Sequence, residues 1–482
     1  MNIWIITTGS SDVQLNTKDH WQNLFRNVRS QVDRGFTPTE GTDNRFLAPA
    51  RVMGTVYSQP QAEQYLGDLT FPLLDNFVGQ LHNKGIDQII LIVTDQTAVF
   101  SPEERRAQHS AYWQDTCTLQ PILETYLHRK FPQAELKRLP LQPKSPTEGL
   151  DDWDYVLKLV QGEFSKLDFP DKSTIYVSHQ AGTPAISSAV QFSILAKFGE
   201  RVEFLVSSER NSSLTRILDG STYLRGIRLQ EAKTRLERHD YFGVKEVFNS
   251  YLKPEEQKLL EAAIKWNHAE FKKFTDELKD CSNQKLKQEA QERTKEENWW
   301  WSAYESAYLA IVRLEQKNTV EAMFHSFRAV EGVIGYWSKQ EYPGDIEHRK
   351  GKPVAILCSP SNLPQYLIEQ LKESKNNEMA LYGEGLFKLL RESKPEFKED
   401  NDMKVIWNSA KSKRNDQFHQ LLGLDEKEVF QAWGMNSQRS WETRLLNCLK
   451  LITNQSHFTS IKKASLMAKV HKELVNAIAS YL

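Results

Sequence analysis

The first 210 residues alternate short apolar, β-branched runs with stretches of helical periodicity, and this alternation limits the fold more than any other feature of the sequence. The runs that predict strands are, in chain order, Ile3–Thr7, Ile89–Thr94, Leu136–Leu139, Thr174–Ser178 and Val202–Val206. Apolar residues three to four positions apart predict helices over Thr116–Lys130 and Glu148–Lys166. Strands and helices in this order predict a doubly wound α/β domain, with a mostly parallel sheet and helices on both faces.

The strand pattern stops near Gly226, and the rest of the chain has helical periodicity. The helices predicted there are Leu229–Leu252, Glu255–Lys279, Asn283–Gln316, Thr319–Lys339 and Leu363–Glu373, with several more towards Leu482. Residues 34–60 carry turn residues without a clean period, which predicts an inserted loop or an irregular edge segment. A length of 482 residues suits several domains, and we predict an α/β domain at 1–225, a helical connector at 226–300 and an all-α domain at 301–482.

Charge and cysteine content exclude several classes of protein. Lys and Arg total 62 against 63 Asp and Glu, so any site for a polyanion has to be local. The 4 cysteines lie far apart without a Cys-x-x-Cys pair, which argues against a thiolate zinc site and against a disulfide-stapled secreted scaffold. The chain begins MNIWIITTGSSD, which reads as a strand and not as a signal peptide, and it has no apolar stretch long enough to span a bilayer. We therefore predict a cytoplasmic protein without a membrane partner.

Small polar residues follow the predicted strands, and they form the first candidate site. The candidate ligand residues in these loops are Thr8, Gly9, Ser10, Ser11, Asp95, Gln96, His179, Gln180, Gly182 and Thr183. Because the carboxyl ends of parallel strands meet at one edge of a sheet, these loops are expected to converge where such folds bind ligands. Thr183 is a good N-cap and Pro184 a good first helical residue, so a helix start with free N–H groups, which favours phosphate, is predicted there. The alternative is ordinary turn composition. Neither G-x-x-x-x-G-K-[ST] nor G-x-G-x-x-G occurs, which argues against an ATPase or a dehydrogenase.

A second candidate site is the string Arg414-Asn415-Asp416-Gln417-Phe418-His419, an R-x-x-x-x-H pattern. An imidazole can move protons at neutral pH, and a guanidinium can grip a phosphate and stabilise its developing charge. These groups meet the requirements for cutting RNA by attack of its own 2′-OH, without a metal. Two copies facing each other across a dimer axis supply two of each group, so a homodimer is part of the hypothesis. The alternative is a surface Arg and a partly buried His in ordinary helical roles.

Histidines elsewhere in the chain give weaker evidence for a site. His325, Arg328 and Glu331 share a predicted helix face at three- to four-residue spacing and are candidates for a second wall of the site, a solvated polar stripe being the alternative. His268, His348 and His457 have no acidic or histidine neighbours at metal-ligand spacing, and no metal site is predicted.

Both candidate sites point to one family. A SHQAGTPAISSAVQF loop and helix, followed by FRAVEG and later by RNDQFH, resembles the CARF–HEPN ribonucleases that accompany type III CRISPR systems, over nearly the whole chain. The resemblance implies an amino-terminal, Rossmann-like CARF domain that dimerises and senses a cyclic oligoadenylate, with the tetra-adenylate favoured and the hexa-adenylate possible. It also implies a helical HEPN domain that carries R-x(4–6)-H and cuts single-stranded RNA.

Residue by residue, Arg414 and His419 match the nuclease motif of that family, Asn415 matches the Asn that often follows its Arg, and Glu331 matches an acidic residue of a neighbouring helix. The segments Thr8–Ser11 and Gly182–Pro184 match the two ligand loops.

The resulting hypothesis is a homodimeric, metal-independent endoribonuclease that is silent until a cyclic oligoadenylate binds, with no cofactor and no obligatory protein partner. One alternative is a non-catalytic cyclic-nucleotide sensor whose helical half binds a partner. Another is that the α/β half also degrades its own cyclic ligand slowly, as a ring nuclease.

Overall fold

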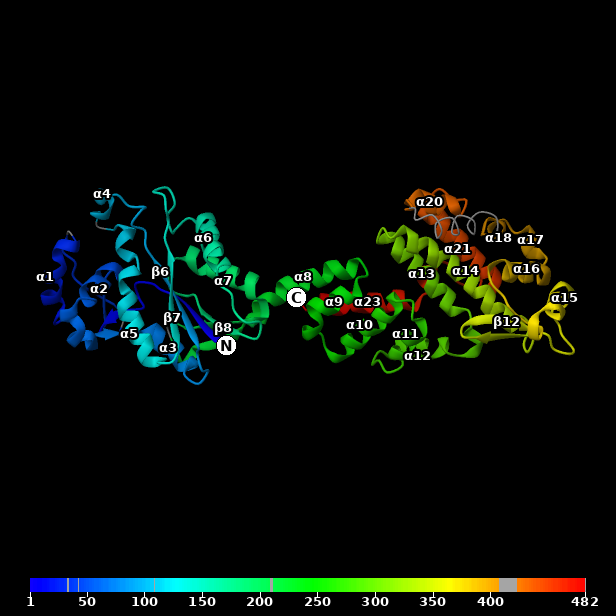
Figure 1. The fold of residues 1–482 in the computed structure, drawn as a ribbon, viewed down its shortest axis with the longest axis horizontal. Helices are drawn as coiled ribbons and strands as arrows, with labels where there is room; N and C mark the ends of the chain where they lie inside the picture. Colours follow the sequence, from blue (N-terminus) through cyan, green and yellow to red (C-terminus); the bar gives the residue numbers. More distant parts are fainter. Residues whose placement is uncertain (33, 42, 108, 209–210, 407–422, 482) are drawn as a thin grey trace. The chain divides into compact units, whose positions relative to one another are not determined.

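The computed structural model describes residues 1–482 except 33, 42, 108, 209–210, 407–422 and 482. The chain forms two compact units, Met1–Gly226 and Ile227–Leu482 (Figure 1). The buried side chains of the second unit form one hydrophobic cluster that extends from Leu229 to Ile478. The division of this unit at residue 300 stays a prediction. Within the described residues, no helix combines the length and the apolar character that crossing a membrane requires.

The first unit is built on a six-stranded sheet with the order β10-β9-β8-β1-β6-β7. Its strands are β1 Asn2–Thr7, β6 Gln88–Thr94, β7 Glu135–Leu141, β8 Thr174–Ser178, β9 Val202–Val206 and β10 Arg216–Asp219. Every pairing is parallel except that of β10, which lies antiparallel to β9 at one edge. All five predicted strands are therefore present, and β10 is an addition.

Helices cover both faces of this sheet because successive side chains of a strand point to opposite sides. On β1, Trp4 and Ile6 join a core with α1, α2, α3 and α5, whereas Ile3 and Ile5 join a second core with α6 and α7. The helices of the unit are α1 Trp21–Val32, α2 Ala50–Tyr57, α3 Pro72–Leu81, α4 Pro102–Arg105, α5 Gln120–Lys130, α6 Trp153–Ser165 and α7 Pro184–Phe198. This arrangement confirms the predicted doubly wound α/β fold.

The prediction of an irregular segment at 34–60 was wrong in its second half. Residues Ala50–Tyr57 form α2, with Val52, Met53 and Val56 fully buried. The preceding part contributes two short strands to a small antiparallel sheet of order β3-β4-β2-β5. The four strands of this sheet are β2 Gln14–Leu15, β3 Thr39–Glu40, β4 Phe46–Leu47 and β5 Leu69–Thr70, and the segment contributes β3 and β4. The helix was missed because it is short and the turn residues around it hide its period.

The second unit is mainly helical, as predicted. Its helices, counted from the one that crosses the boundary between the units, are α8 Gly220–Glu237, α9 Tyr241–Phe248, α10 Pro254–Asn267, α11 Phe271–Leu278, α12 Gln284–Arg293, α13 Trp301–Glu315, α14 Thr319–Glu341, α15 Gln365–Glu373, α16 Gly383–Ser393, α17 Glu396–Glu399, α18 Asn401–Val405, α20 Glu426–Ala432, α21 Gln438–Thr453, α22 Ile461–Ala464 and α23 Leu466–Ala479. The antiparallel pair α13 and α14 lies side by side near the centre of the unit (Figure 1).

Two expectations for this unit need correction. Two predicted long helices, Leu229–Leu252 and Glu255–Lys279, are each two helices, because the backbone turns left-handed at His239 (φ 54°) and at Ala269 (φ 56°). Asp240 then caps α9 by accepting a hydrogen bond from the Gly243 N–H. The strand signal also does not stop at Gly226, since β11 Ile346–Arg349, β12 Lys352–Ile356 and β13 Glu378–Ala380 form a small antiparallel sheet.

A buried carboxylate joins three helices of the second unit. Glu305 of α13 is fully buried and accepts hydrogen bonds from the indole N–H of Trp266 at 2.9 Å, from the Ser465 hydroxyl at 2.6 Å and from the Leu466 N–H at 2.6 Å. Burial raises the pKa of Glu305, while the nearby Arg293 and these donors oppose the rise. Glu305 therefore connects α10 to the start of α23.

We expect Glu305→Ala to lower the free energy of unfolding by about 3 kcal/mol or more. The reason is that three buried donors lose their acceptor, and an unsatisfied buried donor costs roughly 1–3 kcal/mol. Urea unfolding of the full chain measures the change. Glu277→Ala, an exposed position on α11, is the matched control, and equal effects of the two variants contradict the assigned role of Glu305.

Candidate functional site

The strand order places the first candidate site at one point of the sheet. From β1 the chain adds β6 and β7 on one side, and then returns to add β8 and β9 on the other side. The loops that leave β1 and β8 are therefore neighbours that belong to opposite directions of winding. Open parallel sheets bind ligands in the crevice at such a switch point.

Two glycines bring these loops into contact. A Cβ added at Gly9 would lie 2.9 Å from the backbone nitrogen of Gly182, closer than a real side chain permits. Gly182 has a φ of +95°, in the region that favours glycine. The close approach of the two backbones thus explains the glycine at position 9, and the positive φ explains the glycine at position 182.

The hydroxyl groups of the first loop have different environments. Thr8 is buried, and its hydroxyl contacts the carbonyl oxygen of Ile92 at 2.7 Å and the Thr116 hydroxyl at 2.6 Å. The Ser10 hydroxyl donates to the Gln114 side-chain oxygen at 2.5 Å, and Ser11 is exposed. Thr8 thus holds the loop to the sheet, while Ser10 and Ser11 are open to a ligand.

The loop after β8 is held by its own polar side chains. His179 is half-buried, with Nδ1 2.9 Å from the Ser187 hydroxyl, and burial lowers the pKa of its imidazole. Gln180 pairs with the backbone of Ser207 through both ends of its amide, at 3.0 and 2.6 Å. A neutral His179 keeps this part of the site uncharged at neutral pH.

The helix start predicted at Thr183 is confirmed. Thr183 is the N-cap of α7, its hydroxyl accepts from the Ile186 N–H, and Pro184 is the first helical residue. The Thr183 hydroxyl also contacts the Leu150 carbonyl oxygen at 3.0 Å. The amino end of α7 therefore lies at the switch point, with the electrostatic character that suits a phosphate.

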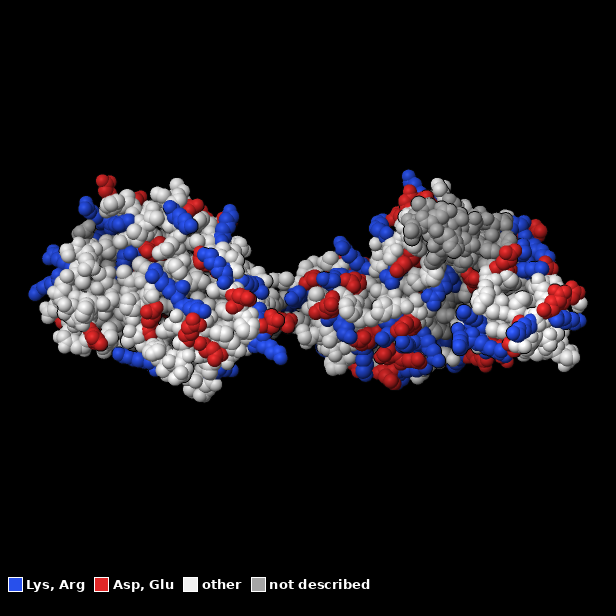
Figure 2. All heavy atoms as spheres, in the orientation of Figure 1, with Lys and Arg blue, Asp and Glu red and all other residues white. Residues whose placement is uncertain are grey.

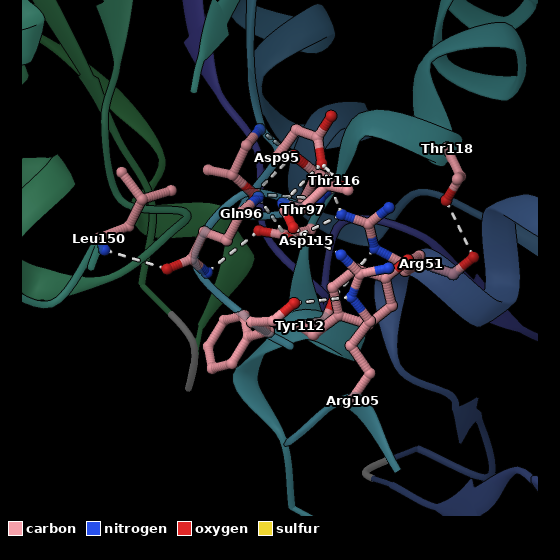
Figure 3. Close-up of polar contacts among 12 residues, drawn as sticks. Arg51, Asp95, Gln96, Thr97, Arg105, Tyr112, Asp115, Thr116, Thr118 and Leu150 are labelled. Carbon is pink, nitrogen blue, oxygen red and sulfur yellow. Dashed lines mark hydrogen bonds and ion pairs between the residues drawn. The ribbon is translucent and has the colours of Figure 1, made fainter. Parts of the chain in front are cut away.

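Asp95 and Gln96, the candidates after β6, belong to an internal network (Figure 3). The guanidinium of Arg51, from α2, donates to Asp95 and to Asp115, both at 2.8 Å, and lies over the Tyr112 ring. Gln96 is buried, and its backbone and side-chain N–H groups donate to Asp115 at 2.8 and 3.1 Å. These side chains hold the loop after β6 in place through hydrogen bonds inside the unit.

The two carboxylates of this network have opposite pKa shifts. Burial raises the pKa of Asp115 even though Arg51 and Gln96 oppose the rise. Burial acts the same way on Asp95, but hydrogen bonds from Thr97 and Arg51 outweigh it, so the pKa of Asp95 is lowered. The sequence did not single out Arg51, because it lies in the segment predicted to be irregular and its partners are 44 and 64 residues away.

Asp12 is a second residue of the site that sequence reasoning passed over. It is 1% exposed, and its Oδ2 accepts from the Gly9 N–H at 2.7 Å. Its Oδ1 is buried without a hydrogen-bond partner among the described residues. Burial raises the pKa of Asp12 to about 7, against the effect of the Gly9 bond. Asp12 is therefore a carboxyl group that is half protonated at neutral pH and is hydrogen-bonded to one of the two contacting glycines.

The second candidate site is described only in part. Arg414, Asn415 and His419 lie outside the described residues. Glu331, on α14, accepts a hydrogen bond from the Gly383 N–H at 2.9 Å.

The remaining residues predicted to share this face of α14 have different surroundings. His325 is buried, and burial with the nearby charges of Arg328 and Arg313 lowers its pKa to about 4. Arg328 is exposed. The face predicted from spacing is therefore split by tertiary packing, with His325 inside and Arg328 in solvent.

The charges on the face drawn in Figure 2 follow the overall composition. Acidic and basic side chains are interspersed over both units in Figure 2, as the near-zero net charge predicts. Among the described residues, no group of three or more His, Cys, Asp or Glu is placed to hold a metal ion.

Comparison with known proteins gives a likeness in fold. No protein-family model and no curated protein matches the chain. Among solved structures, Enterococcus italicus Csm6 bound to cyclic hexa-2′-fluoro-hexa-dAMP matches with 12% sequence identity and a TM-score of 0.56, over 99% of this chain and 100% of that chain. The resemblance to CARF–HEPN proteins is therefore confirmed at the level of the fold, an α/β unit followed by a helical unit, from end to end.

The raised pKa of Asp12 predicts a pH dependence of stability. Between the unfolded value near 4 and the folded value of about 7, the folded chain holds a proton that the unfolded chain has lost. Stability from this group is thus complete below pH 4 and is lost as the pH rises towards 7. We expect Asp12→Asn to gain stability relative to the unchanged chain as the pH rises from 5 to 8.

Thermal unfolding of both proteins across that pH range measures the effect, and the difference between them cancels the other titrating groups. A difference that does not change with pH contradicts the buried, partly protonated Asp12.

Proposed function

We propose that the chain is a cyclic oligoadenylate-activated endoribonuclease that cuts single-stranded RNA without a metal ion, in type III CRISPR defence. The observation that carries the proposal is the end-to-end likeness in fold to Csm6, whose solved structure holds a cyclic hexa-dAMP analogue. The glycine contact at the switch point and the Arg414–His419 string in the helical unit support it independently.

The sensor half of the proposal rests on the loops after β1 and β8. Ser10, Ser11 and the amino end of α7 offer hydroxyl and N–H groups to phosphates and riboses. A cyclic oligoadenylate has near-rotational symmetry, so a two-fold dimer can present the same loops to it twice. Both the tetra-adenylate, which the family resemblance favours, and the hexa-adenylate, suggested by the ligand of Csm6, are candidate activators.

Exposed apolar side chains support a homodimer. Trp153 on α6 is 58% exposed and Phe192 on α7 is 64% exposed, both in the unit that carries the ligand loops. Large exposed apolar side chains on adjacent helices are typical of an association surface.

The nuclease half assigns roles to four residues. His419 acts as general acid or base, or orients the 2′-OH, and Arg414 stabilises the charge that develops on the phosphate. Asn415 positions their loop. Glu331, fixed by the Gly383 N–H, completes the set from α14.

The first test is His419→Ala, which we expect to reduce RNA cleavage by about 10²–10⁴-fold, the usual contribution of catalytic proton transfer. Cleavage of labelled single-stranded RNA in the presence of activator and excess EDTA measures the effect. Arg414→Ala is expected to give a similar loss.

The control for this test is His457→Ala, an exposed histidine of the same unit, which is expected to cleave normally. Near-normal cleavage by the His419 variant places the active site elsewhere. Ligand binding without any cleavage by the unchanged protein favours the non-catalytic sensor.

The second test concerns activation. A hundredfold activation requires about 2.7 kcal/mol of differential affinity of the activator for two states of the protein. Gly182→Trp fills the contact between the loops, so we expect it to abolish stimulation by either cyclic oligoadenylate and to leave weak basal cleavage. Cleavage rates with and without each ring are the measurement.

Gly199→Trp is the matched control, because Gly199 also has a positive φ but lies at the far end of α7 with open space around it. It carries a similar backbone strain and is expected to respond to the activator. Full stimulation of the Gly182 variant, or maximal cleavage without any ligand, contradicts this mode of activation.

A further inference from the structure

The second unit contains a cleft of about 720 Å³, which shares only Arg328 with the candidate sites. It is bounded by α11, by the segment from the end of α12 to the first turns of α13, by α14 and by β11. Its volume is within the range of small-molecule and cofactor sites, roughly 300–1,000 Å³. The cleft therefore offers enough room for a ligand of nucleotide size.

The lining of this cleft is basic, although the whole chain has a net charge of −1. Two glutamates, Glu270 and Glu296, face six basic residues. The basic residues are Lys272, Lys273, Arg293, Lys295, Arg328 and Lys339. Because the composition of the whole chain is balanced, a polyanion ligand needs a local excess of positive charge, and this cleft has one.

Half of these basic residues have structural partners. Lys273 pairs with Glu270 at 2.8 Å, Lys295 pairs with Glu292 at 2.7 Å, and Arg293 donates to a backbone carbonyl oxygen at 2.9 Å. Lys272, Arg328 and Lys339 are exposed, and no described carboxylate lies within ion-pair distance of them. These three side chains are available to a ligand.

Aromatic rings lie among the charges. Trp299 and Trp301 are partly exposed at the start of α13, and Tyr336 of α14 is 43% exposed. The Tyr336 ring lies 4.9 Å from that of His348. Basic side chains interleaved with exposed aromatic rings are typical of surfaces that bind single-stranded nucleic acid, where phosphates meet the cations and unpaired bases stack on the rings.

The cleft is lined by one face of α14, and Glu331 lies at the border of that face. Arg328, Gly332, Tyr336 and Lys339 line the cleft and recur at three- to four-residue spacing, as one helix face requires. On an ideal helix, Glu331 lies about 60° from Arg328, about 80° from Lys339 and about 140° from Tyr336, so it borders the face that lines the cleft. Of the residues assigned to cutting, Glu331 is the one that the structure describes, and it does not line the cleft.

We propose that this cleft binds a segment of single-stranded RNA next to, and not including, the bond that is cut. The proposal rests on the proposed function in that it takes the substrate to be RNA. The cleft raises the affinity for RNA without taking part in the chemistry, so its loss raises KM and leaves kcat almost unchanged.

The test measures binding of a labelled, single-stranded 2′-O-methyl RNA, which cannot be cut by its own 2′-OH, to the full chain without activator. Arg328→Glu/Lys339→Glu is expected to weaken binding at least tenfold, and Tyr336→Ala about fivefold to tenfold. Neutralising the same two basic residues, Arg328→Ala/Lys339→Ala, should reduce the slope of log affinity against log salt by about 1.4, since each phosphate contact on a single strand contributes about 0.7.

The matched control is Lys285→Glu/Lys472→Glu, which makes the same charge change at exposed lysines outside the cleft. An equal loss of binding in the control overturns the proposal, as does the absence of RNA binding at low salt. Equal affinity for polyglutamate, unaffected by Tyr336→Ala, also overturns it, in favour of a surface for acidic proteins. Equal binding of single-stranded DNA supports the site and assigns the choice of RNA to the cutting residues.

Cleavage assays on the same variants separate this proposal from the proposed function. RNA binding in the cleft by a protein that never cleaves leaves the cleft proposal standing and removes the ribonuclease. If the Arg328→Glu/Lys339→Glu protein cleaves RNA with a normal KM and a normal kcat, the cleft proposal is wrong and the ribonuclease proposal stands.

Discussion

The parallel pairing of β1 with β8 is the interaction on which the first unit depends. In the six-stranded sheet, β6 and β7 lie on one side of β1, and β8 then pairs with its other side. This single reversal makes the loops at Gly9 and Gly182 neighbours, although 173 positions separate them in the sequence. The site is thus created by topology: Gly9 is needed because two backbones come into contact there, and Gly182 because its φ is positive.

Much of the first unit could be predicted from the sequence, for a physical reason. Parallel strands buried on both faces are continuous apolar runs, so the runs at Ile3, Ile89 and Thr174 needed no knowledge of their partners. The N-cap at Thr183 is equally local. Arg51 could not be recognised, because its role arises from contacts with Asp95 and Asp115 that only the folded chain supplies. The same holds for Gln96, whose polar side chain was predicted to face a ligand and is buried.

The helical unit shows a different limit of prediction from sequence. Periodicity identified α14, yet the spacing that grouped His325, Arg328 and Glu331 did not determine their environments. Residues three apart are about 60° apart on a helix, so the next layer of structure can bury one and expose its neighbour. Packing against α13 encloses His325 and leaves Arg328 at the cleft. Left-handed turns at His239 and Ala269 were missed for a related reason, since neither residue type signals a break.

In the two proposals, the two units bind phosphate by different physical means. The loops Thr8–Asp12 and His179–Thr183 contain no Lys or Arg, and the nearby Arg51 is already paired with two carboxylates. A ligand there is held by N–H groups, hydroxyls and shape, which act only at short range and in one geometry. The cleft between α11 and α14 instead has three cations without a carboxylate partner among the described residues, and their attraction reaches further and is weakened by salt. Recognition of a defined small ring suits the first arrangement, and capture of variable RNA suits the second.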